Sequence, residues 1–74
     1  MGLLFYDIEF QRHIDVEKEV ELNLEQIKYY IRTRGKTGIR FRYYEEMEQF
    51  KNILHNKLDN VMMFNSGSIL YIRR

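Results

Sequence analysis

Near the start of the chain, four polar side chains that could take part in catalysis occupy every second position: Asp7, Glu9, Gln11 and His13. Alternate side chains of an extended strand point to the same side, so all four would project together. Two carboxylates and an imidazole in this arrangement could hold a divalent metal ion for phosphodiester hydrolysis. The same alternation is typical of the solvent-facing side of an amphipathic strand, which is the interpretation we favour. We therefore expect no metal site here, and metal-dependent nuclease activity stays only as an idea to test.

Few other combinations of catalytic residue types occur in the sequence. It has no cysteine, which removes thiol nucleophiles, cysteine-ligated zinc and iron–sulfur clusters. The two histidines, His13 and His55, fall on different expected elements, and no Ser-His-Asp arrangement can be assembled with any specificity. Residues 35–37, Gly-Lys-Thr, resemble the end of a phosphate-binding loop, but the required earlier glycine is missing and the order of helix and strand is reversed. We expect a protein that is not an enzyme and that needs no cofactor.

A basic segment with aromatic neighbours, residues 32–44, is the best candidate for a binding site. The side chains that we expect to form it are Arg32, Arg34, Lys36, Arg40, Arg42 and Tyr44. Arginine pairs with phosphates and stacks on bases, and tyrosine adds a stacking surface. Arg40 and Arg42 would point the same way in a strand. A second interpretation stays open, in which these arginines form cross-strand pairs with the acidic row Glu17, Glu19 and Glu21.

The length of 74 residues allows one domain, residues 1–74, built around one core. A core of this size rarely supplies more than about 3–5 kcal/mol of stability. Without cysteine there are no disulfides to add to it, so dense aromatic packing or a second copy of the chain must help. Phe and Tyr make up 15% of the residues, which favours aromatic packing, and a homo-oligomer stays open.

Charge and hydropathy exclude several classes of partner. Lysines and arginines number 12 against 11 acidic residues, and this net charge of +1 argues against a strongly basic nucleic-acid coat or an acidic mimic of DNA. No apolar run approaches the roughly 18 residues that span a bilayer, so we expect no membrane partner. Asp7 and Glu9 interrupt the apolar start before it could become a signal-peptide core, and we expect a cytoplasmic protein.

The first half of the chain changes its hydrophobic period once. Apolar residues at every second position predict two strands, over residues 4–14 and 16–24, which we expect to pair antiparallel. From Asn23 onward the apolar spacing becomes three and four, which indicates a short helix. Asn23 can cap the first turn of this helix, and Gly35 can end it in a left-handed conformation.

The second half contains a strand, a helix and a hairpin. Lys36 and Thr37 are expected in a turn, after which alternation over 39–44 predicts a third strand. Residues 45–58 have one apolar face, with glutamates near the start and lysines later, which predicts the longest helix. Two apolar runs, 61–64 and 69–72, flank a polar segment that contains Gly67 and predict a β-hairpin.

These elements predict an α+β fold in the order ββαβαββ. We expect two layers, with two helices packed on one face of a small, mainly antiparallel sheet. Such a fold carries no function by itself, so function must be argued from the surface.

The leading expectation is a small non-enzymatic module that binds a protein partner. Exposed tyrosine and methionine are favoured at recognition surfaces, and the chain is rich in both. Residues with AT-rich codons dominate the composition, which favours a low-GC bacterium or a phage or mobile element as the source and an adaptor or inhibitor as the role. The alternative expectation is a nucleic-acid-binding module that uses the basic segment 32–44.

Overall fold

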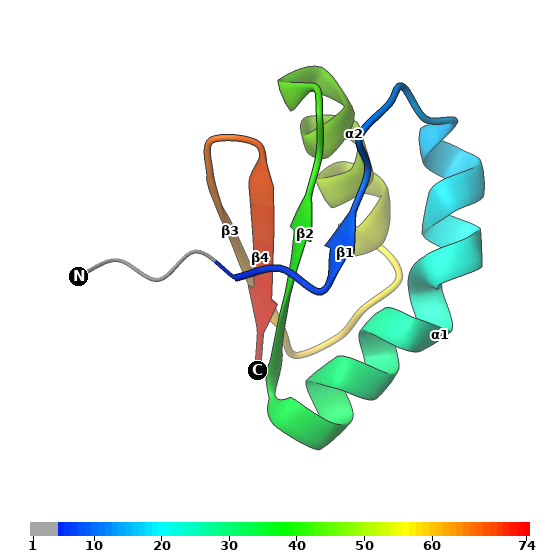
Figure 1. Cartoon of the computed structure of the whole chain (residues 1–74). Helices are drawn as coiled ribbons and strands as arrows, with labels where there is room; N and C mark the ends of the chain where they lie inside the picture. The colour runs from blue at the N-terminus through cyan, green and yellow to red at the C-terminus, as the bar shows by residue number, and fades with distance from the viewer. Residues whose placement is uncertain (1–4) are drawn as a thin grey trace.

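The computed structural model of the chain describes residues 5–74 and shows two layers, a sheet and a pair of helices (Figure 1). Its elements, in chain order, are β1 (Ile8–Glu9), α1 (Val16–Arg34), β2 (Lys36–Arg40), α2 (Tyr44–His55), β3 (Met62–Ser66) and β4 (Ile69–Arg73). The sheet has the order β1-β2-β4-β3, in which β1 lies parallel to β2 and β4 lies antiparallel to both of its neighbours. The expected α+β fold, with two helices on a small, mainly antiparallel sheet, is confirmed.

The core lies between the two helices and one face of the sheet. Its buried side chains come from both helices and from the two central strands, and include Val20, Ile27, Ile31, Met47, Phe50, Leu54, Ile39, Leu70 and Ile72. Phe10 and Phe41 close one end of this core against Phe50, with ring centroids 5.1 to 6.2 Å apart. Among residues 5–74, neither helix is long and apolar enough to cross a membrane.

The expected second strand over 16–24 is wrong, because these residues form the first half of α1. Val16 and Val20 are buried on the core side, as a helical spacing of four requires, whereas the side chain of Leu22 is 65% exposed. Asp15 caps the helix by accepting a hydrogen bond from the backbone N–H of Lys18 at 3.3 Å. The chain therefore runs βαβαββ, with one strand fewer than the sequence suggested.

Asn23, the expected N-cap, lies in the middle of α1 and donates a hydrogen bond to the carbonyl oxygen of Glu19 at 2.7 Å. The expected helix end at Gly35 is confirmed. Gly35 has a φ of 80°, and its N–H donates to the carbonyl oxygen of Ile31 at 2.8 Å. Acidic residues in the first turn of α1 and basic residues in its last turn complement the helix dipole.

Strands β1 and β2 differ in extent from the expectation. The strand expected over 4–14 is reduced to β1, Ile8–Glu9, and residue 4 lies outside the described residues. Lys36 and Thr37 were expected in a turn but are the first two residues of β2. They directly follow Gly35, which caps the end of α1, and they pair with Arg73 and Ile72 of β4. Strand β2 ends at Arg40, so Arg42 follows the strand rather than lying in it.

The helix and the hairpin of the second half are confirmed. Helix α2 begins at Tyr44, one residue earlier than expected, and ends at His55, three residues earlier than expected. It has 12 residues and α1 has 19, so the expectations that α2 is the longest helix and that the helix ending at Gly35 is short are wrong, because α1 also includes residues 16–22. Strands β3 and β4 are joined by a two-residue turn, Gly67-Ser68, in which Gly67 has a φ of 58°. A glycine at the first position of such a turn matches the twist of the two strands and sets their register.

Candidate functional site

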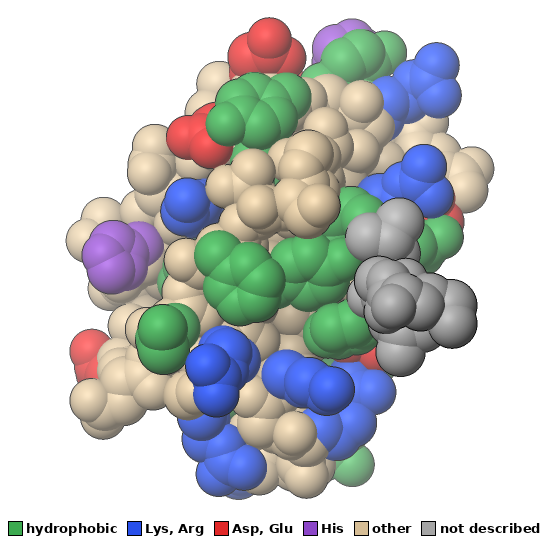
Figure 2. Space-filling model, turned by 90° about the vertical axis from the view of Figure 1, so that its left-hand side faces the viewer, with side chains coloured by type: hydrophobic (Ala, Val, Ile, Leu, Met, Phe, Trp, Pro, Cys, Tyr) green, Lys and Arg blue, Asp and Glu red, His purple; other side chains and the backbone are tan. Residues whose placement is uncertain are grey.

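The register of the three longer strands decides which side chains share the face of the sheet that the helices leave open. Residues directly opposite one another in a sheet point to the same face. The central row on this open face is Phe64, Tyr71 and Gly38; the row on one side is Met62, Arg73 and Lys36, and the row on the other side is Ser66, Ile69 and Arg40. Aromatic rings thus occupy the middle of the face and cations lie on both sides of them. Figure 2 views this side and shows apolar side chains at the centre with Lys and Arg below them.

Three rings form a continuous aromatic surface on the open face. The rings of Phe64 and Tyr71 stack with centroids 5.3 Å apart, and the ring of Phe5 tilts against Tyr71 at 5.2 Å. Tyr71 is buried beneath its neighbours, while Phe64 keeps 50% of its surface exposed. Phe64 is therefore the ring on this face that is most accessible to a planar ligand.

The absence of a side chain at Gly38 allows the backbone of Phe5 and Tyr6 to cross this face. A Cβ atom at Gly38 would lie 2.6 Å from the carbonyl oxygen of Phe5, which is closer than real Cβ contacts come. Two backbone hydrogen bonds hold this crossing, from Asp7 to the carbonyl oxygen of Gly38 at 2.8 Å and from Phe10 to that of Arg40 at 2.9 Å. Gly38 thus positions Phe5 next to the aromatic row.

A basic pocket of about 450 Å³ opens beside the aromatic surface. Phe5, Phe64 and Tyr71 form its apolar walls, and its charged lining residues are Arg34, Lys36, Arg73 and Arg74. The backbone N–H of Arg74 donates to the carbonyl oxygen of Gly35 at 2.9 Å, which brings the end of β4 to the end of α1. None of the lining residues is acidic, and Lys36, Arg73 and Arg74 form no ion pair with any other residue of 5–74.

Arg34 is held in place by a polar cluster at the rim of this pocket. Its guanidinium lies 2.6 Å from Oδ2 of Asp7, which also accepts a 2.6 Å hydrogen bond from the hydroxyl of the fully buried Thr37. Burial raises the pKa of Asp7, but the hydrogen bonds from Arg34 and Thr37 outweigh it, so the pKa lies below its ordinary value. The guanidinium also lies 4.2 Å from the ring centroid of Tyr30. Part of the bonding capacity of Arg34 is therefore used inside the protein, while 46% of its side-chain surface stays exposed.

Arg40 and Arg42 line a second, more polar pocket of about 600 Å³, together with Glu9, Gln11 and Tyr43. Arg40 pairs with Glu9 at 3.8 Å, and its guanidinium lies 5.6 Å from the ring of Tyr6. The guanidinium of Arg42 lies 5.9 Å from the ring of Tyr43. This pocket is less basic than the first because Glu9 offsets one of its two cations.

The structure brings only part of the expected site together. Lys36 and Arg40 share the open face, and Arg34 and Arg42 lie at its margins. Arg32 lies elsewhere, over the ring of Tyr29 at 5.6 Å. Tyr44 begins α2, and a hydrogen bond to Glu48 raises its pKa.

The expected alternative, in which these arginines pair with Glu17, Glu19 and Glu21, is wrong. Those glutamates lie on α1, and within 5–74 the ion pairs of the basic segment go from Arg34 to Asp7 and from Arg40 to Glu9. Sequence reasoning also missed Phe64, Tyr71 and Arg73 as neighbours of Lys36. The two-residue turn could have aligned Phe64 with Tyr71, because it sets the register of the hairpin, but no local signal places Lys36 beside them.

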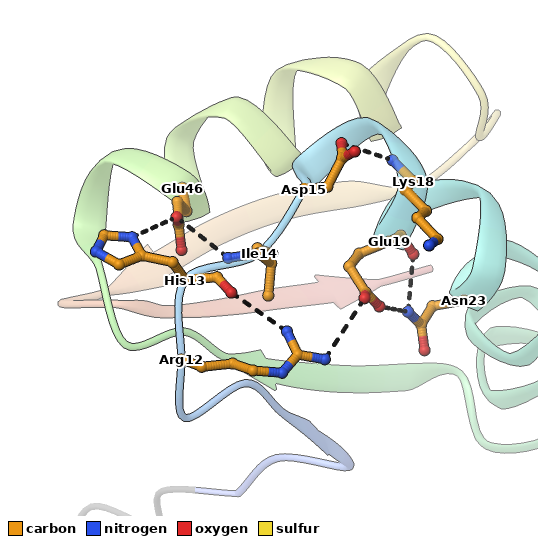
Figure 3. A network of polar contacts seen from close by, with 8 residues as sticks. All are labelled: Arg12, His13, Ile14, Asp15, Lys18, Glu19, Asn23 and Glu46. Atoms are coloured by element: carbon orange, nitrogen blue, oxygen red, sulfur yellow. Dashed lines mark hydrogen bonds and ion pairs between the residues drawn. The ribbon is translucent and has the colours of Figure 1, made fainter.

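The polar residues around the loop between β1 and α1 form a separate network (Figure 3). Nδ1 of His13 lies 2.9 Å from Oε2 of Glu46, which also accepts a hydrogen bond from the backbone N–H of Ile14. The imidazole stacks on the ring of Tyr43, with centroids 3.7 Å apart. Arg12 lies 3.7 Å from Glu19 of α1. These contacts tie the loop to both helices, which is a structural role.

The four polar residues at alternate positions near the start do not form a common site. Asp7 contacts Arg34 and Thr37, Glu9 contacts Arg40, and His13 contacts Glu46. Within residues 5–74, no group of three or more His, Asp or Glu side chains is arranged to hold a metal ion. Comparisons of the chain with protein-family models, with curated proteins and with solved structures gave no match.

Proposed function

We propose that the open face of the sheet binds single-stranded nucleic acid. The observation that carries this proposal is the row of aromatic rings, Phe64 and Tyr71 with Phe5 beside them, lying between cations on the same face. Bases stack on the rings, and phosphates lie next to the cations on either side. This is the nucleic-acid expectation from the sequence, moved from the segment 32–44 to a surface that three strands build together.

The exposed ring of Phe64 favours bases over a purely ionic ligand. Stacking of a base on an aromatic side chain contributes about 1–3 kcal/mol and tolerates any base, because every base has a flat π-face. Half of the Phe64 surface is exposed, and the ring packs against the ring of Tyr71 on the neighbouring strand. A ring held by such packing loses little conformational freedom on binding, so more of the stacking energy appears as affinity.

The cations on the open face favour phosphates. Lys36 and Arg73 occupy directly opposite positions in β2 and β4, and both are exposed without an ion pair to residues 5–74. Two neighbouring like charges cost free energy in the unbound protein, and a phosphate between them relieves that cost. Single strands fit better than duplexes because a duplex stacks its bases internally and would leave Phe64 without a partner.

A protein partner, the leading expectation from the sequence, is the second candidate. The observation that favours it is the exposure of Met62 and Phe64, at 59% and 50%, on the outermost long strand of the sheet. Such side chains are enriched where proteins contact one another. The ring of Phe64 discriminates between the two candidates. Bases need it for stacking, whereas an acidic protein surface would bind to Lys36 and Arg73 through charge.

The test is a titration of the protein into a labelled single-stranded oligo(dT) of about 10 nucleotides, followed by fluorescence anisotropy at several salt concentrations. Contacts of Lys36, Arg40 and Arg73 with phosphates predict that the logarithm of the association constant falls with the logarithm of salt concentration with a slope of about −2. Phe64→Ala should weaken binding about 5- to 150-fold at a single salt concentration without changing that slope.

The double variant Lys36→Ala, Arg73→Ala should weaken binding and reduce the slope by about 1.4, because two phosphate contacts are lost. Lys28→Ala, Arg32→Ala is the matched control, since it removes the same charge from α1 and should leave the slope unchanged. An absence of binding at low salt, or equal losses in the two double variants, would overturn the proposal. Binding of an acidic peptide that is insensitive to Phe64→Ala would move the assignment to a protein partner.

A further inference from the structure

The outer edge of β3 lacks the features that protect edge strands. Strand β3 pairs with β4 over its whole length, Met62–Ser66, and no residue within 5–74 pairs with its other side. Natural proteins protect such edges with charged residues, prolines, bulges or very short strands, because free N–H and C=O groups invite another strand to pair. The sequence of β3, Met-Met-Phe-Asn-Ser, contains neither charge nor proline, and its register with β4 is unbroken. The opposite edge, β1, is only two residues long.

The hydrogen-bonding pattern shows which backbone groups this edge offers. The N–H of Phe41 donates to the carbonyl oxygen of Ser68 at 2.9 Å, on the side where β4 meets β2. Backbone groups along a strand alternate between its two sides, so Leu70 and Ile72 also bond toward β2. Residues 69, 71 and 73 then bond toward β3, where their partners are residues 66, 64 and 62. The N–H and C=O groups of Met63 and Asn65 therefore point outward from the edge.

We propose that β3 pairs antiparallel with β3 of a second copy of this chain, around a two-fold axis at Phe64. In this register Met63 of each copy lies opposite Asn65 of the other, and each such pair exchanges two hydrogen bonds, which satisfies all of the outward groups of the two residues. Phe64 then lies opposite Phe64 of the second copy in a non-hydrogen-bonded pair, in which side chains come closest.

Other two-fold registers use less of the strand. A two-fold axis at Met63 or at Asn65 also brings outward N–H and C=O groups of the two copies opposite one another. Each of these axes, however, pairs only three of the five residues of one β3 with residues of the other β3. An axis at Met63 would further place Asn65 opposite Val61, next to Asn60, whose φ of 60° ends the extended backbone. The axis at Phe64 pairs all five residues, Met62–Ser66, so it buries the most edge.

The charges and rings of the open face are compatible with this dimer. Antiparallel pairing carries Arg73 of one copy toward Ser66 and Ile69 of the other, so the Lys36 and Arg73 pairs of the two copies lie at opposite ends of the joined sheet, each in the same row as Arg40 of the other copy. The stacked pair Phe64 and Tyr71, at 5.3 Å, meets its symmetry copy at the axis and forms one row of four rings. The dimer does not depend on nucleic-acid binding, although it would double the length of the surface proposed above.

Single cysteines test the axis directly, because the chain has no cysteine of its own. Phe64→Cys should form a covalent dimer under mild oxidation, since the Cα atoms of a non-hydrogen-bonded pair lie about 4.5 Å apart, within the range of a disulfide. Met62→Cys and Ser66→Cys are matched controls on the same exposed face. Neither should cross-link alone, but a mixture of the two should, because Met62 lies opposite Ser66 of the second copy. Equal cross-linking of all three single variants, or none from Phe64→Cys, would overturn the register.

Light scattering without nucleic acid tests the dimer itself. At high micromolar concentration the native protein should have twice the mass of the 9.2 kDa chain. Asn65→Pro, which removes an outward N–H but no bond to β4, should be monomeric, whereas the control Asn65→Ala keeps that N–H and should stay dimeric. A monomeric native protein would overturn the proposal. The outer edge of β3 would then be open to pairing with a strand of another protein. If Asn65→Pro does not fold, as judged by circular dichroism, the cysteine series decides alone.

Discussion

Gly38 of β2 lies directly beneath Phe5, and a Cβ atom at position 38 would stand 2.6 Å from the carbonyl oxygen of Phe5. The clash is with backbone, which cannot rotate away as the end of a side chain could. Gly38 therefore couples the packing of the first described residues to the aromatic row, since the ring of Phe5 also lies 5.2 Å from that of Tyr71.

Gly38→Ala should lower the free energy of unfolding by about 1–3 kcal/mol, the usual cost of forcing extra atoms into a packed site. Urea unfolding followed by circular dichroism measures this loss. Ser66→Ala, on the exposed outer strand of the same face, is the control and should change stability by no more than about 0.5 kcal/mol. Equal stability of Gly38→Ala and the native protein would mean that the Phe5 backbone does not lie over β2.

Asp7 should make the stability of the protein depend on pH in the acid range. Its pKa is lower in the folded protein than the unfolded value of about 3.9, because the bonds from Arg34 and Thr37 outweigh burial. A group with a lowered folded pKa contributes stability above its unfolded pKa, and this contribution is lost as the pH falls through the folded pKa. Asp7→Asn should therefore be less stable than the native protein at neutral pH, and the difference should shrink as the pH falls below about 4.

Urea unfolding of both proteins at neutral and at acid pH provides this comparison. Asp59→Asn is the matched control, since Asp59 is exposed and forms no ion pair within residues 5–74. A stability difference between Asp7→Asn and the native protein that is the same at both pH values would contradict the role of the charge. The loss of the bond to the buried Thr37 would then account for the whole effect.

The helical conformation of residues 16–24 predicts opposite results for two neighbouring apolar residues. Val20 is fully buried in α1, and Leu22, two positions later, is 65% exposed. Leu22→Lys should change the free energy of unfolding by no more than about 0.5 kcal/mol, whereas Val20→Lys buries a charge without a partner and should prevent folding. In a strand the two residues would share the buried face, and both substitutions would be equally damaging. Thermal unfolding of the two variants separates these cases.

Local signals determined much of this fold from the sequence. The hairpin followed from two apolar runs around Gly67, and the end of α1 followed from a glycine at position 35 that adopts a left-handed conformation. Helix α2 followed from a single apolar face with acidic residues at its start. Each of these signals lies in a short stretch of sequence, so neighbouring residues are enough to specify the element.

The apolar pattern of residues 16–24 was ambiguous for a physical reason. Val16, Val20 and Leu24 are four residues apart, a spacing that satisfies both a strand, where even separations share a face, and a helix, where four residues make about one turn. Only packing against α2 and β2 decides between the two, because it buries Val16 and Val20 and leaves Leu22 in solvent. The length of β1 was equally undetermined, since it depends on where β2 offers a partner.

The candidate surface was within reach of the sequence only in part. Composition and spacing predicted Lys36 and Arg40 as candidate binding residues, but grouped them with Arg32 and Tyr44, which lie elsewhere in the fold. Arg73, Phe64 and Tyr71 join Lys36 because β4 inserts between β2 and β3, which brings together residues more than 25 positions apart. The pairing of β4 with β2 is set by long-range contacts, and no local pattern records it. Local patterns in the sequence therefore predicted most of the helices and strands and the kinds of side chain available for binding, whereas long-range pairing in the folded chain decided which side chains form one surface.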